Sequence, residues 1–179
     1  MTDSLFVHPD ICLQCAGQGR TCCELSDTGD EEFCFPLSDV ERERIVAADA
    51  AHAQCFVFAP NTPGFVQQLG VLLPEYTVQT AFPESGFHWR LAITQTRQCV
   101  FLGPAGCVLD RALRPTYCQL FPLWVLRGQL TWFAAPECLA HAQCLSARNM
   151  LTAMHTTQAE VLSLFSTLCA GLHLSKVNA

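Results

Sequence analysis

The sequence has little charge and almost no lysine. Only 15% of its 179 residues are charged, and Lys176 is the one lysine among ten basic residues. Sixteen acidic residues give a formal net charge of −6, and nine of these acids lie between Glu24 and Asp49. A basic surface is therefore not expected, and nucleic acid is not a predicted partner. Because half of the residues are hydrophobic, the composition also argues against intrinsic disorder.

The chain also lacks the segments that take a protein into or across a membrane. Residues 1–10 contain no basic stretch followed by an apolar one, as a secretory signal would. The longest uncharged apolar stretch, residues 161–175, is shorter than the ~20 residues that span a bilayer, and polar side chains interrupt it. We therefore expect a cytoplasmic protein without a membrane span.

Length and hydrophobic periodicity predict a small single α+β domain covering residues 1–179. Ser38 and Glu41 form a capping box, so a helix should run from there to about Ala51. Thr62, followed by proline, predicts the start of a second helix. Residues 139–172 carry apolar positions at helical spacing, which predicts one long helix, or two with a break near Thr156 and Thr157. Residues 10–34 show no sustained period and should form irregular loops.

Short β-hairpins are expected in the middle of the chain. The residues joining the first hairpin, Gly103-Pro-Ala-Gly106, are turn formers, and the hairpin would bring Cys99 close to Cys107. In the second hairpin, Arg127-Gly128 would form a tight turn with positive φ. The expected strands are residues 88–94, 99–102, 107–109, 121–126 and 129–133.

Cysteine is what the chain has in excess. Twelve cysteines in a reducing compartment point to metal binding or catalysis before structural disulfides. In Cys12-Leu-Gln-Cys15, two residues separate the thiols, a spacing typical of zinc and iron-sulfur ligands. Cys22 and Cys23 follow as an adjacent pair, and both can be ligands only if the backbone wraps the site or if they face different sites. A disulfide between them would need a strained ring.

Further cysteines follow downstream, with an arginine between two of them. Cys99 and Cys107 flank the first expected hairpin, and Arg114-Pro115 precedes Cys118. Cys138 and Cys144 lie six residues apart around His141. Four thiolates around a zinc ion or a [4Fe-4S] core leave an excess of negative charge, which a guanidinium hydrogen-bonded to sulfur would offset. The simpler interpretation of Arg114 is a surface arginine in a turn.

With these residues in view, the chain closely resembles the CxxCxxCC family, also called YkgJ-type cysteine-cluster proteins or zinc- or iron-chelating domains. The resemblance covers residues 12–144. Its motifs are Cys22-Cys23, Pro36-Leu37-Ser38, Cys99-x-Phe101-Leu102, Cys107, Arg114-Pro115, Cys118 and Phe121-Pro122. The chain differs from the family in having six residues, 16–21, between the CxxC and the CC, and in having Gln119 in place of an arginine.

We expect an iron-sulfur cluster, of the [4Fe-4S] type, with zinc as the alternative. The preference for iron comes from the resemblance, which extends to flagellin lysine methylases with a related cluster segment, and from the absence of paired zinc knuckles. Cys34, Cys55 and Cys169 are assigned to the core or to loops, and Arg114 is the expected partner of the cofactor. The nine candidate ligands are Cys12, Cys15, Cys22, Cys23, Cys99, Cys107, Cys118, Cys138 and Cys144.

Nine thiolates exceed the four that one tetrahedral zinc or one cubane cluster takes, so either two sites exist or some of these cysteines are not direct ligands. The sequence has no radical-SAM CxxxCxxC, phosphate-binding glycine loop or HExxH motif. The first hypothesis is a metal-binding module for electron transfer or for redox or metal sensing. The alternatives are part of an enzyme, methyltransferase-like or oxidoreductase, that acts on a partner protein, a structural zinc module, and a disulfide-stabilised extracytoplasmic protein.

Overall fold

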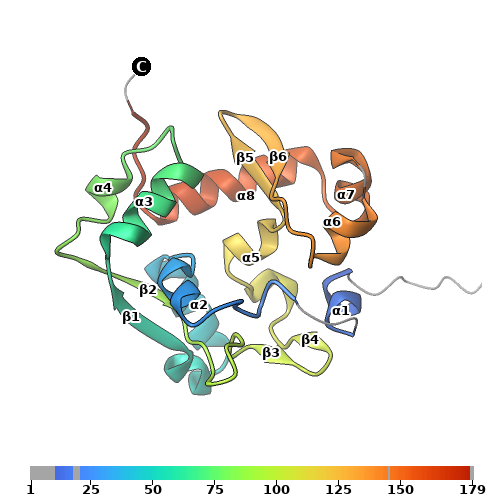
Figure 1. Cartoon of the computed structure of the whole chain (residues 1–179), viewed down its shortest axis with the longest axis horizontal. Coiled ribbons are helices and arrows are strands. Elements are labelled where there is room, and N and C mark those ends of the chain that lie inside the picture. The colour runs from blue at the N-terminus through green and yellow to red at the C-terminus, as the bar shows by residue number, and fades with distance from the viewer. Residues whose placement is uncertain (1–10, 18–20, 145, 178–179) are drawn as a thin grey trace, which may run out of the picture.

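Helices and small antiparallel strand pairs make up the fold, which confirms the α+β class (Figure 1). The computed structural model describes residues 11–17, 21–144 and 146–177, apart from the side chains of Cys12 and Leu13. The α-helices are α1 (Ile11–Ala16), α2 (Asp39–Ala48), α3 (Pro63–Leu72), α4 (Val78–Ala81), α5 (Thr116–Leu120), α6 (Leu139–Gln143), α7 (Ala147–Ala153) and α8 (Gln158–Gly171). The 3-10 helices are η1 (Gly29–Phe33), η2 (Ala50–Cys55) and η3 (Arg111–Leu113).

The strands pair in twos. They are β1 (Phe56–Pro60) with β2 (Phe87–Leu91), β3 (Leu102–Gly103) with β4 (Gly106–Cys107), and β5 (Leu123–Leu126) with β6 (Gln129–Trp132). Both expected hairpins are present, although β3 and β4 are shorter than predicted. At the β5–β6 turn, Arg127 and Gly128 have φ values of 50° and 70°, as a type I′ turn requires. Strand β1 was not expected from the sequence.

Capping residues begin the longer helices as predicted. The Ser38 hydroxyl accepts a hydrogen bond from the Glu41 amide (3.3 Å), and the Glu41 carboxylate accepts one from the Ser38 amide (2.9 Å). Thr62 caps α3 by accepting from the Phe65 amide at 3.1 Å. Helix α2 ends at Ala48 instead of about Ala51, and η2 follows it.

The C-terminal region is split more than the sequence indicated. The predicted break near Thr157 is present, and Thr157 forms a second capping box with Glu160 at the start of α8. A further break separates α6 from α7, where the Ser146 hydroxyl caps α7 by accepting from the Asn149 amide at 3.2 Å. The expectation of one or two helices was therefore wrong. Irregular backbone was likewise the wrong prediction for Ile11–Ala16, which forms α1.

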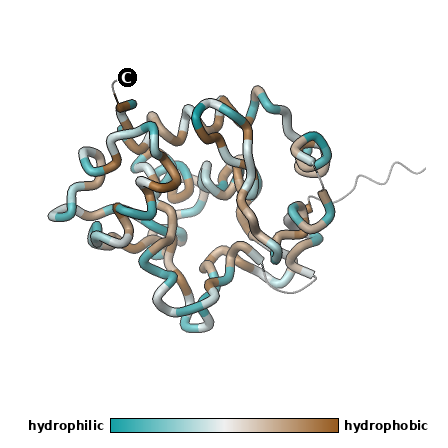
Figure 2. The backbone as a smooth tube through the Cα atoms, turned by 45° about the horizontal axis from the view of Figure 1, so that its top comes forward, coloured by the Kyte–Doolittle hydropathy of each residue, from teal (hydrophilic) through white to brown (hydrophobic). Residues whose placement is uncertain are grey.

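Two hydrophobic clusters stabilise the fold. The larger one joins α3, α5, β5 and α8, with Phe65, Leu120 and Phe165 among its buried residues. The smaller one packs under β1, with Ile45 and Phe101 at its centre. Figure 2 shows hydrophobic and hydrophilic stretches interleaved along the whole backbone. Within the described residues, no helix has the length and apolarity needed to cross a bilayer.

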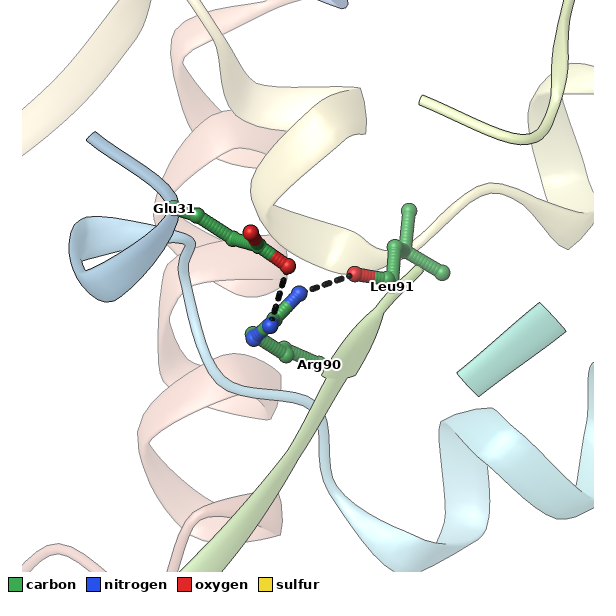
Figure 3. Close-up of polar contacts among 3 residues, drawn as sticks. All are labelled: Glu31, Arg90 and Leu91. Atoms are coloured by element: carbon green, nitrogen blue, oxygen red, sulfur yellow. Dashed lines mark hydrogen bonds and ion pairs between the residues drawn. The ribbon is translucent and has the colours of Figure 1, made fainter. Parts of the chain in front are cut away.

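An ion pair attaches η1 to strand β2. The Arg90 guanidinium donates to the Glu31 carboxylate and to the Leu91 carbonyl, the latter at 3.1 Å (Figure 3). The Arg90 side chain is nearly buried, so water screens this pair less than a surface pair. The pair holds η1 against β2, and Cys34 follows η1 directly.

The Glu41 carboxylate connects two helices. It is buried, and besides capping α2 it accepts a 2.6 Å hydrogen bond from the Thr116 amide at the start of α5. Helices α2 and α5 lie close together in Figure 1, and this carboxylate fixes the start of α5 relative to α2. Helix α5 carries Cys118, so the link also positions a thiol.

We predict that Glu41→Ala lowers the free energy of unfolding by roughly 2–3 kcal/mol, because buried amides of Ser38 and Thr116 lose their acceptor. Glu160→Ala is the matched control, since it breaks the other capping box at an exposed position. Urea unfolding of both metal-free variants measures the effect. Equal destabilisation by the two substitutions would contradict the proposed link between α2 and α5.

His88 is a buried neutral histidine. Its ring stacks on Phe65 with the ring centroids 3.8 Å apart, and its Nδ1 lies 2.9 Å from Asn61 Oδ1. The Asn61 amide nitrogen donates to the Pro83 carbonyl, so Oδ1 is the acceptor and His88 Nδ1 carries the proton. Burial, followed by the charge of Arg90, lowers the pKa of His88 to about 4.

The unfolded chain binds this proton with an ordinary histidine pKa near 6.5, whereas the folded chain binds it only near pH 4. The free energy of unfolding should therefore have its full value above pH 6.5 and decrease as the pH falls toward 4. A shift of this size corresponds to at most ~3 kcal/mol. Urea unfolding of the metal-free protein between pH 7 and pH 4 measures it. His88→Phe should flatten this dependence, while the control His155→Asn, at an exposed position, should leave it unchanged; an unchanged slope in His88→Phe would refute the assignment.

Candidate functional site: a cavity lined by cysteines

One cavity of about 320 Å³ is lined by cysteines from segments that lie far apart in the chain. Its volume lies at the lower end of the ~300–1,000 Å³ range of small-ligand pockets. Apolar residues of both hydrophobic clusters line it, including Leu139 and Phe101. The lining cysteines are Cys15, Cys22, Cys23, Cys34, Cys99, Cys107, Cys118 and Cys138.

Seven of the nine predicted ligand cysteines are therefore brought together. Cys144 is not among the lining residues, and the Cys12 side chain lies outside the described part of the structure. The eighth lining cysteine, Cys34, had been assigned to the core or to loops. The position of Cys34 at the end of the cysteine-rich segment, residues 10–34, could have indicated that it lines the cavity. The ion pair between Arg90 and Glu31, which fixes η1 just before Cys34, could not be seen in the sequence.

Two of the predicted bystanders lie in the hydrophobic clusters. Cys169 is buried on α8 in the larger cluster, and Cys55 packs against the smaller one. Neither lines the cavity. Every cysteine whose side chain is described is a free thiol.

Backbone pairing brings Cys23 next to Cys99. The Cys99 amide donates to the Cys23 carbonyl at 2.7 Å, and the Leu25 amide donates to the Arg97 carbonyl at 2.9 Å. Between them, Glu24 and Gln98 form an antiparallel bridge. The segment after the CC pair therefore runs alongside the segment that leads into the first hairpin.

The β3–β4 hairpin adds Cys107 to this group. Leu102 pairs with Cys107, and the Leu102 amide donates to the Cys99 carbonyl at 2.9 Å, so Cys99 and Cys107 lie at the same end of the hairpin. Gly106 has a φ of 104°, a conformation that side chains with a Cβ rarely adopt. The turn formers in the sequence thus predicted the right pair of cysteines.

Arg114 is buried beside these thiols, with 7% of its surface exposed. Its Nε donates to the Leu109 carbonyl at 3.0 Å, which fixes the guanidinium under the hairpin. Its charge favours the thiolate forms of both Cys23 and Cys107, against burial, which favours the neutral thiols, and it hydrogen-bonds Cys107. The interpretation as a surface arginine in a turn is therefore wrong.

The backbone of Arg114 anchors α5. Its carbonyl accepts from Arg44 Nη2 at 3.2 Å and from Gln119 Nε2 at 2.7 Å. Gln119 thus has a structural partner in this chain. Together with Glu41, these contacts hold Cys118 at the cavity.

A second set of thiols lies on α1 and at the two ends of α6, and these helices pack against each other. Cys15 on α1 approaches the Glu137 carbonyl, with 3.9 Å between sulfur and oxygen. Cys138 immediately precedes α6, and Cys144 follows it. Burial raises the pKa of Cys138, and nearby Cys15 and Cys144 raise it further.

Most of the cavity thiols are held in the neutral form. Burial raises the pKa of Cys99 to about 12 and also raises the pKa values of Cys34 and Cys107. Cys118 has an exposed surface where it lines the cavity, yet the protein around it desolvates the thiol and raises its pKa well above the usual value. Neighbouring Cys23, Cys99 and Cys107 add to this effect.

Cys23 is the exception. The pKa of Cys23 is lowered to about 7, chiefly by a hydrogen bond from Cys22. Thr21 and the charge of Arg114 lower it further, and these three effects together outweigh burial, which raises it. Near neutral pH Cys23 is therefore substantially ionised, whereas Cys99, Cys107 and Cys118 are not. A thiolate is both the nucleophile and the metal ligand in cysteine chemistry.

Within the described residues, no three cysteine, histidine, aspartate or glutamate side chains converge closely enough to hold a metal ion as they stand. Sulfur ligands lie ~2.3 Å from a bound zinc ion, so their sulfur atoms must converge on one point. Neutral thiols in a cavity are not drawn together in this way. Metal binding replaces thiol protons and draws the ligands together. The donor set suits a soft metal centre, and its assembly would require side-chain rotation.

No protein-family model, no curated protein and no solved structure matches the chain. The functional proposal therefore rests on the fold, the cavity and the cysteine pattern of the sequence.

We predict that Cys23 reacts faster than Cys99, Cys107 and Cys118 with iodoacetamide at pH 7 in the metal-free, reduced protein, because its thiolate fraction is larger than theirs. Peptide mapping by mass spectrometry gives the rate at each cysteine. In Cys22→Ala the pH midpoint of this reaction should move upward, since the main hydrogen bond to the thiolate is lost. A rate at Cys23 no higher than that at Cys99 would contradict the ionisation pattern.

Proposed function

We propose that the chain is a metal-binding protein that holds an iron-sulfur cluster, or alternatively zinc, through thiolates around this cavity. The observation that carries the proposal is the meeting of eight thiols, from segments far apart in the sequence, at one cavity. Cysteines that serve only as small hydrophobes would be distributed through the core, as Cys169 is. Thiolates are the ligands that iron-sulfur centres and structural zinc prefer.

The size and lining of the cavity favour a cluster over a single ion. Four thiolates at ~2.3 Å close around one zinc and leave no space between them, whereas this cavity encloses about 320 Å³. Phe33, Phe101, Tyr117 and Phe121 contribute to an apolar lining that would limit access of water. Solvent exposure and hydrogen bonds to sulfur are among the factors that set the potential of an iron-sulfur cluster.

Arg114 supports the same proposal. Thiolate-ligated centres carry excess negative charge, and a buried guanidinium beside Cys23 and Cys107 compensates part of it. The resemblance to the CxxCxxCC family in the same residues is a second line of support. On this proposal the protein works in a reducing compartment, the cytoplasm, in electron transfer or in redox or metal sensing.

Anaerobic purification followed by quantitation of iron, sulfide and zinc tests the proposal. The wild-type chain should carry iron and sulfide in equal amounts with visible absorption, or else stoichiometric zinc without colour. Cys99→Ala should bind clearly less metal than the wild-type chain, because Cys99 lines the cavity.

Cys55→Ala is the matched control, since Cys55 and Cys99 are both half-buried and pack against the same small cluster, but Cys55 does not line the cavity. It should retain the wild-type metal content. Wild-type protein that stays metal-free after anaerobic reconstitution with iron, sulfide or zinc would overturn the proposal, as would equal metal contents in the two variants.

A further inference from the structure

We propose that the cavity holds two separate metal centres, one ligated by Cys23, Cys99, Cys107 and Cys118 and the other by Cys15, Cys138 and Cys144. The inference rests on the proposed function, because it divides among two centres the thiols that the proposal assigns to metal binding. It also goes beyond the cavity lining, since Cys144 belongs to the second set without lining the cavity.

The first set is assembled by hydrogen bonds that do not involve α1 or α6. The Cys23 carbonyl accepts from the Cys99 amide, and the Cys99 carbonyl accepts from the Leu102 amide opposite Cys107. Cys118 is held from the other side by the contacts that anchor α5. The result is four thiols with one buried arginine, the ligand number and the charge partner that a single cubane cluster or tetrahedral zinc requires.

The second set is assembled by the packing of α1 on α6. Cys15 reaches the Glu137 carbonyl next to Cys138, which links the two helices at the thiols themselves. Cys138 and Cys144 flank α6, at either end of its five residues. Figure 1 shows α1 and α6 together at one side of the molecule, with α5 nearer its centre.

Five of the seven thiols also divide between the two hydrophobic clusters. Cys15, Cys138 and Cys144 pack against the larger cluster, whereas Cys99 and Cys107 pack against the smaller one. Helix α1 contacts β4 as well as α6, so the two sets lie next to each other but are held by different hydrogen bonds and packing contacts.

Titration of the reduced, metal-free protein with Zn²⁺ under anaerobic conditions tests the division. After gel filtration, elemental analysis of the wild-type chain should give two zinc equivalents. Cys99→Ala/Cys118→Ala, which leaves two thiols in the first set, and Cys138→Ala, which leaves two in the second, should each retain one equivalent, and the variant that combines all three substitutions should retain none. Cys55→Ala should keep both, and circular dichroism of each variant checks that it is folded.

A measurement on the wild-type chain makes the test independent of how the variants fold. Alkylation and peptide mapping at one zinc equivalent should show one complete set protected and the other set reactive, with both protected at two equivalents. Loss of all zinc in Cys99→Ala/Cys118→Ala or in Cys138→Ala, with one equivalent in the wild type protecting both sets, would establish a single centre. That result would overturn the division and leave the proposed function intact, whereas wild-type protein that binds no zinc and no cluster would overturn both.

Discussion

The burial of many thiols around one small space is the constraint on which the rest of the structure depends. If several of these thiols were ionised without a metal, their charges would repel one another inside an apolar cavity. The protein avoids this because burial raises the pKa of Cys99, Cys107 and Cys118 and keeps them neutral. A metal centre must then replace these protons, so its affinity is linked to pH and its binding energy is coupled to local rearrangement of the chain.

The fold meets this constraint with short elements tied by specific hydrogen bonds. Its sheets are two-stranded in the described part of the chain, and isolated two-stranded sheets are marginally stable in water. Stability comes instead from the packing of α3, α5 and α8. The Glu41 carboxylate also holds the start of α5, the helix that carries Cys118, next to α2. The buried Arg114 supplies a fixed positive charge where thiolates would form. Loops can therefore present thiols to one cavity without a large sheet behind them.

Local signals in the sequence predicted the local parts of this structure. The capping residues Ser38, Thr62 and Thr157, the turn at Gly128 and most of the cavity cysteines could be identified because each signal lies within a few residues. Strand β1, the place of Cys34 and the contact of α1 with α6 depend on partners far along the chain. Spacing alone does not encode which distant segments meet, so the sequence did not indicate which of their cysteines would lie together.

X-ray absorption at the metal edge of protein purified anaerobically tests the central claim most directly, because it reports the atoms bound to the metal without any substitution. The account predicts a first shell of sulfur at ~2.3 Å, as thiolate ligation of zinc requires, with an additional iron–iron distance if the centre is a cluster. A first shell made only of nitrogen and oxygen would contradict it, because the cavity cysteines would then not be the ligands.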